Sequence, residues 1–213
     1  MRYFMLWPLL VLAACGANDV TSGPASDDRE YATQIDVPSP DYAALIAGAP
    51  EIVPSEIDGE PASLNAPPIS EAALPAVRMW PAATMPTEFQ MEAAFSGRIF
   101  LRDGCVFIQS SNEGAREKLA WFHAETGLDL DAEGFYVLIN RVTGQISGRL
   151  GETMTWAGPN PIDQSDPAIA AYREACGDYD VEGVGNPQAN EKRYVIYPHL
   201  RQPPDSAPPP GLE

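Results

Sequence analysis

The chain has few basic residues and no long apolar run. Its 213 residues contain 13 Lys and Arg against 30 Asp and Glu, a formal net charge of −17 at pH 7. Nucleic-acid binding needs a basic face that neutralises phosphates, so this charge argues against DNA or RNA as a partner. It also argues against a polybasic patch for anionic lipid. No apolar run reaches the roughly 20 residues with which a helix spans a bilayer.

Residues typical of catalytic and metal sites are also scarce. The only two histidines, His123 and His199, belong to no H-E-x-x-H motif and no Cys/His cluster, so we expect no zinc site. No serine lies in a G-x-S-x-G context, and no C-x-x-C motif is present. The sequence therefore implies no cofactor and names no nucleophile.

One acidic segment is a weak candidate for calcium. Asp129, Asp131 and Glu133 follow the spacing at the start of a calcium-binding loop. Such a loop usually ends with a bidentate carboxylate at its twelfth position, which is Asn140 in this chain. We therefore favour a solvated turn and expect no bound metal.

The N-terminus carries the clearest targeting signal. Arg2 precedes a short apolar segment that ends in small residues, the layout of a secretory signal peptide. The last four residues of this segment, Leu12-Ala13-Ala14-Cys15, resemble the lipobox of bacterial lipoproteins. In that class the cysteine thiol receives a diacylglyceryl group and cleavage occurs before the cysteine. The resemblance implies that residues 1–14 are removed and that Cys15 becomes the lipidated first residue.

The resemblance also implies a compartment. Two or three acyl chains on Cys15 would hold the protein to membrane lipid more firmly than a single myristoyl chain. Gly16 occupies the position where an Asp often retains such lipoproteins at the inner membrane. We therefore expect a cell-envelope protein, lipid-anchored in the outer membrane and facing the periplasm. The alternative is an ordinary cleaved signal peptide in which Cys15 has no role.

Composition divides the rest of the chain into three parts. Residues 15–75 are predicted to be the lipid anchor and a disordered tether, because residues 16–75 hold nine Pro and eleven acidic residues against one basic residue. A short helix near residues 41–46 is the alternative for one stretch. Residues 76–200 are predicted to be the globular domain, beginning with an irregular strap over 76–92, and the Pro-rich residues 201–213 a disordered tail.

The domain shows both strand and helix patterns. The elements expected, in chain order, are a hairpin of strands 96–102 and 105–108 around Asp103-Gly104, an amphipathic helix over 115–126 ending at Gly127, strands 134–140 and 145–156, a helix from Asp166 to Gly177, and strands 179–184 and 193–197. This order predicts an α+β fold, a small antiparallel sheet with two helices. The alternative is a partly open β-barrel of the OB type.

Two cysteines remain once Cys15 is lipidated. Export would place Cys105 and Cys176 in an oxidising compartment, where disulfides persist. We therefore predict a Cys105–Cys176 bond. The alternative is a pair of separate buried thiols that pack as small hydrophobic side chains.

A binding face can be suggested from one strand region. Arg141, Arg149 and Trp156 could together bind carboxylates or sugars, but we favour the alternative in which the arginine stems pack over the sheet and the tryptophan lies in the core. The leading hypothesis is an envelope lipoprotein whose domain binds a ligand or acts as a scaffold, with an envelope protein or a cell-wall component as partner. The alternative is a periplasmic, hydrolase-like enzyme whose site is assembled only in the folded chain.

Overall fold

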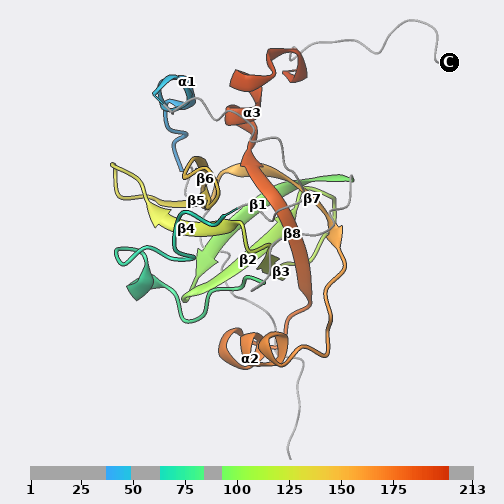
Figure 1. The fold of residues 1–213 in the computed structure, drawn as a ribbon. Coiled ribbons are helices and arrows are strands. Elements are labelled where there is room, and N and C mark those ends of the chain that lie inside the picture. The colour runs from blue at the N-terminus through green and yellow to red at the C-terminus, as the bar shows by residue number, and fades with distance from the viewer. Residues whose placement is uncertain (1–36, 49–62, 84–92, 202–213) are drawn as a thin grey trace, which may run out of the picture. The chain divides into compact units, whose positions relative to one another are not determined.

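The computed structural model describes residues 37–48, 63–83 and 93–201 (Figure 1). The lipobox with Cys15, the remainder of the tether, residues 84–92 of the strap and the tail from residue 202 lie outside the described residues, so the statements about them remain predictions. Within the described residues, no helix has the length and apolar character needed to cross a membrane.

Three helices, two 3₁₀ turns and eight strands make up the described chain. In order they are α1 (Tyr42–Ala47), η1 (Leu74–Ala76), β1 (Ala94–Arg102), β2 (Cys105–Ser110), β3 (Lys118–Phe122), β4 (Thr126–Leu130), β5 (Tyr136–Asn140), β6 (Ile146–Arg149), β7 (Thr153–Asn160), α2 (Pro167–Cys176), β8 (Val181–Ala189), α3 (Asn190–Ile196) and η2 (Pro198–Leu200).

Five strands close into a barrel in the order β1-β2-β3-β8-β7. All neighbouring pairs are antiparallel except β3 and β8, which run parallel. The segment between β3 and β7 forms a separate antiparallel sheet, β4-β5-β6. The fold is therefore mixed, with mostly strands, and the barrel fits the OB-like alternative better than a small open sheet.

The first hairpin forms as predicted. β1 and β2 pair from Arg102 and Cys105 outward, and the turn residues Asp103 and Gly104 have φ of 51° and 77°. Positive φ at both central residues is the type I′ turn that Asp-Gly favours, because its twist matches that of the flanking strands.

Side chains of the barrel strands alternate between two apolar layers. In β2, Val106 and Ile108 point into the barrel interior, whereas Cys105 and Phe107 point outward. The outer layer packs under α2, where Ile169 and Tyr172 cover it. The buried residues of the interior are Ala73, Ile99, Val106, Ile108, Ala120, Phe122, Leu128, Leu138, Leu150, Met154, Trp156 and Val184.

Helix α2 begins and ends as predicted. The Asp166 side chain accepts a hydrogen bond from the Ala168 N–H, Pro167 is the first helical residue, and Gly177 follows the helix with φ of 103°. The Tyr172 hydroxyl donates to the carbonyl of Val106, which ties the helix to β2. The predicted disulfide between Cys105 and Cys176 is present and joins the start of β2 to the end of α2.

The helix expected over residues 115–126 is wrong, because residues 118–122 form β3. Leu119 and Trp121 lie in the outer layer and Ala120 and Phe122 in the interior. A strand buried on both faces reads as a continuous apolar run, so its alternation is hidden in the sequence. The supposed end of that helix lies inside β4, which the sequence analysis missed.

Two predictions near the C-terminal part also need correction. The single strand expected over 145–156 is two strands, β6 and β7, separated at Gly151, whose φ is 101°. The two strands belong to different sheets. Residues 193–197, expected as a strand, lie mostly in α3, which contacts α1, β7 and β8.

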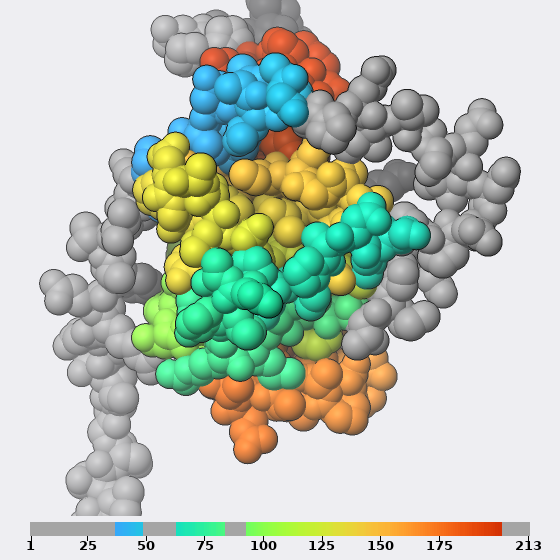
Figure 2. Space-filling model, turned by 60° about the vertical axis from the view of Figure 1, so that its left-hand side comes forward, coloured from blue at the N-terminus to red at the C-terminus, as the bar shows by residue number. Residues whose placement is uncertain are grey.

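Part of the predicted tether belongs to the folded body. Residues 63–83 cross its surface between the β4–β6 region and α2 (Figure 2). Ala73 is fully buried, and Ile69 forms a parallel bridge with Leu128. The strap is confirmed over residues 76–83, where Trp80 stacks on Phe122. The sequence placed the start of the folded domain at residue 76. This boundary is corrected, because the described residues 37–48 and 63–75 also belong to the folded body.

We predict that the disulfide contributes a large part of the stability. The two cysteines are 71 residues apart, so the double variant Cys105→Ala/Cys176→Ala should lose up to about 4 kcal/mol, mainly because its unfolded chain is less constrained. Denaturant unfolding with and without a thiol reductant measures this loss. Cys15→Ala, which leaves the bond intact, is the control. Two alkylatable thiols in the native folded domain would contradict the prediction.

Candidate functional site

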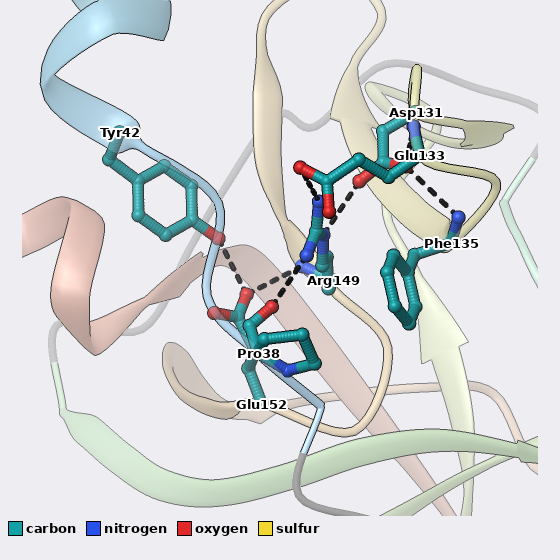
Figure 3. Close-up of polar contacts among 7 residues, drawn as sticks. All are labelled: Pro38, Tyr42, Asp131, Glu133, Phe135, Arg149 and Glu152. Atoms are coloured by element: carbon teal, nitrogen blue, oxygen red, sulfur yellow. Dashed lines mark hydrogen bonds and ion pairs between the residues drawn. The ribbon is translucent and has the colours of Figure 1, made fainter.

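Arg149 lies at the centre of the most extensive buried polar cluster (Figure 3). Its side chain is 1% exposed, and its Nε donates to Asp131 Oδ2 at 2.6 Å. One Nη pairs with Glu133 Oε1 at 3.0 Å, and the other donates to the carbonyl oxygen of Pro38 at 2.6 Å. The guanidinium also stacks over the Phe135 ring, 4.3 Å from its centroid. Arg149 thus joins the β4–β5 turn to the segment that precedes α1.

The turn between β4 and β5 prepares Asp131 for this ion pair. Asp131 Oδ1 accepts the backbone N–H groups of Glu133 and Phe135, which leaves Oδ2 for Arg149. Burial alone would raise the pKa of Asp131, but the N–H donors and the guanidinium outweigh it and lower the pKa below its usual value. The carboxylate therefore stays ionised.

These contacts show what the residues suggested as weak calcium ligands do in the folded chain. Asp131 and Glu133 face an arginine, and Asp129 accepts the N–H of Leu130. Over residues 37–48, 63–83 and 93–201, no group of three or more His, Cys, Asp or Glu side chains is arranged to hold a metal ion. In this structure Asp131 and Glu133 therefore serve as the ionic partners of Arg149.

A second buried carboxylate continues the cluster. Glu152 is 6% exposed, and its Oε2 accepts the Tyr42 hydroxyl at 2.5 Å and the Arg149 N–H at 2.7 Å, whereas its Oε1 has no hydrogen-bond partner among the described residues. Burial and the bond to Glu152 raise the pKa of Tyr42, so the phenol remains a donor. A Cβ on Gly151 would lie 2.8 Å from Val37 Cγ2, and φ at this residue is 101°, so glycine is favoured there.

The cluster holds the chain around α1 against the barrel. Two bonds do this directly, from Arg149 to Pro38 and from Tyr42 to Glu152, and they link residues more than 100 positions apart. Neither Tyr42 nor Glu152 was selected from the sequence as a site residue. A tyrosine in an acidic, Pro-rich segment was the only available signal.

The binding face suggested from the sequence does not form. Arg149 is buried in the cluster, and Trp156 is 1% exposed inside the barrel. Arg141 donates to the carbonyl oxygens of Ala66 and Ala124, where it holds the 63–83 segment. Arg149 on β6 and Trp156 on β7 are buried, and Arg141, which follows β5, is occupied by these two carbonyl groups.

The described surface includes the following two hollows. The larger, about 220 Å³, lies between α1, the β5–β6 turn and Lys192 of α3. The smaller, about 180 Å³, lies along β7 and β8 beside Trp156 and Arg193. Neither His123 nor His199 lines either hollow, and His123 Nδ1 is buried without a hydrogen-bond partner among the described residues.

Comparison of the chain with protein-family models, curated proteins and solved structures found no match.

We predict that breaking the central ion pair is costly. Arg149→Met should destabilise the fold by about 3–5 kcal/mol, because it leaves Asp131 buried without its cation. Denaturant unfolding measures the loss, and hydrogen exchange should show opening of residues 37–48. Arg201→Gln is the matched control, since the Arg201–Glu191 pair is exposed and worth no more than about 1 kcal/mol. Equal losses for the two variants would contradict this ranking.

We also predict an acid-sensitive contribution from Asp131. Its pKa is lowered in the folded state, so its stabilisation is present above the unfolded value of 3.8 and is lost as pH falls through the lower folded pKa. Asp131→Asn should therefore flatten the stability curve below about pH 4. Unfolding free energies from pH 7 to pH 2 test this, and parallel curves for the two proteins would refute it.

Proposed function

We propose that the chain is a lipid-anchored protein of the cell envelope, held by acylated Cys15, whose OB-type barrel faces the periplasm and binds another envelope protein. The lipobox-like sequence supports the anchor. The Cys105–Cys176 disulfide supports export, because such bonds persist outside the reducing cytosol.

An exposed apolar surface carries the binding part of the proposal. Among the described residues, six large apolar side chains are 39–56% exposed, and five of them lie on α1, α3 and η2 or between the last two. α1 contacts α3, and α3 contacts η2. We call this the α1–α3 surface; its residues are Leu45, Val195, Ile196, Tyr197 and Leu200. Grouped exposed apolar side chains mark docking sites for other proteins, whereas scattered ones do not.

The opposite end of the barrel does not offer such a surface. OB-type barrels bind oligonucleotides and oligosaccharides over the outer face of their second and third strands. In this chain α2 covers that face, with Ile169 and Tyr172 packed on Phe107 and Leu119. Figure 1 shows α2 at the other end of the barrel from α1 and α3. The net charge of −17 also disfavours nucleic acid, which leaves the α1–α3 surface as the favoured binding region.

The position of the surface along the chain suits an anchored protein. The described chain begins at Val37, 22 positions after Cys15, and α1 follows at once. Arg149 and Glu152 hold this entry segment on the barrel. A lipid anchor at Cys15 would therefore be connected through the same segment that carries part of the α1–α3 surface.

We predict that Cys15 controls both location and partner capture. The native protein should carry a lipid mass on Cys15 and fractionate with membranes, whereas Cys15→Ala should lose the lipid and its membrane association. Photocrosslinking residues placed at Leu45 and Val195 should capture a protein in intact cells, and capture should fall in the Cys15→Ala background.

The crosslinking control is Glu174, an exposed residue of α2. Equal capture at Glu174 and Val195 would contradict the binding surface. A purified native protein that retains Met1 and carries no lipid would contradict the anchor.

A further inference from the structure

Lys192 is a buried cation without a carboxylate partner in the described structure. It lies in the first turn of α3 and is 5% exposed. Its Nζ donates to the carbonyl oxygen of Ile146, the one hydrogen bond of this ammonium within the described residues. An ammonium has three N–H donors, so two remain for other acceptors.

The other buried charges of the fold are satisfied differently. Arg149 is balanced by Asp131 and Glu133, and the Glu152 carboxylate accepts two donors. A buried ion without an opposite charge is expensive, because its lost hydration is not replaced. Burial accordingly lowers the pKa of Lys192. A single carbonyl oxygen is little compensation for a lysine in this position.

The unbalanced ammonium borders the larger hollow. That hollow holds about 220 Å³ and is lined by Leu45, Ile46 and Ile146 together with the 143–145 turn and Lys192. For comparison, an apolar cavity of about 150 Å³ accommodates benzene. The hollow therefore has room for a compact molecule slightly larger than one aromatic ring, with apolar walls for its body and one cation for its head.

We propose that this hollow is a binding site for a small organic carboxylate with a short apolar body. The carboxylate oxygens accept the two remaining N–H groups of Lys192, and the apolar body packs on Leu45, Ile46 and Ile146. A single cation matches one carboxylate charge better than a phosphate dianion. Free monocarboxylates and the C-terminal carboxylate of a peptide share this chemistry. The proposal does not rest on the lipid anchor, and the hollow shares Leu45 with the α1–α3 surface.

The test uses the purified full-length protein in detergent with three probes: benzoate, acetyl-Ala-Ala with a free carboxylate, and the corresponding acetyl-Ala-Ala amide. Calorimetric titration and thermal unfolding should show saturable binding of one or both acids and none of the amide. Binding of benzoate alone indicates a free monocarboxylate, and preference for the dipeptide acid indicates a peptide C-terminus. Failure of both acids to bind, or equal binding of the amide, would overturn the proposal.

Two variants test separately the roles of the Lys192 cation and of the cavity. Lys192→Met keeps the length of the side chain without its charge and should weaken acid binding at least tenfold, with a melting temperature no lower than that of the wild type. Ile46→Trp keeps Lys192 but fills the hollow and should also abolish binding, so the proposal stays testable if either variant folds poorly. Arg201→Gln, which removes an exposed cation, should bind as the wild type does. Unchanged binding in a folded Lys192→Met protein would refute the site.

Discussion

The arrangement of this chain depends on the contacts that the buried guanidinium of Arg149 makes. It belongs to β6, yet its partners come from the β4–β5 turn and from the segment before α1. Its own N–H also donates to Glu152, just before β7 enters the barrel. A buried cation needs several hydrogen-bonding or charged partners. Because the partners of Arg149 come from different parts of the chain, they hold the small sheet, the barrel and the N-terminal segment together. The same need explains why part of an acidic, Pro-rich stretch is folded.

Short sequence motifs predict the elements whose boundaries depend only on neighbouring residues. Asp103-Gly104 determines the β1–β2 hairpin, and Asp166-Pro167 with Gly177 delimits α2. Neither depends on a distant partner. β3 is different, because α2 covers its outer face and the barrel interior its inner face, so that Leu119 to Phe122 show no alternation of polarity. Only the tertiary fold reveals that this apolar segment is a strand.

In the candidate site, too, contacts between residues far apart in the chain could not be predicted from the sequence. Arg149 and the acidic turn were each recognisable from residue type, and a packed arginine and a turn without metal were the favoured interpretations, but the pairing of the two was not predicted. Their pairing spans 18 positions, and the bond to Pro38 spans 111. Charge patterning within a window of a few residues contains no information on such pairs. Lys192 was missed for a related reason, since nothing around it in the sequence indicates that α3 places it against Ile146.

The two ends of the barrel are stabilised by different kinds of interaction. At the α2 end, a disulfide and aromatic packing by Phe107, Tyr172 and Tyr179 close the surface. At the other end, α1 is held by hydrogen bonds to buried charged groups, beside a hollow and the α1–α3 surface. Polar contacts with few apolar neighbours open at lower free energy than a cross-linked core. Binding of a partner or a ligand can therefore change the α1 end while the α2 end stays fixed.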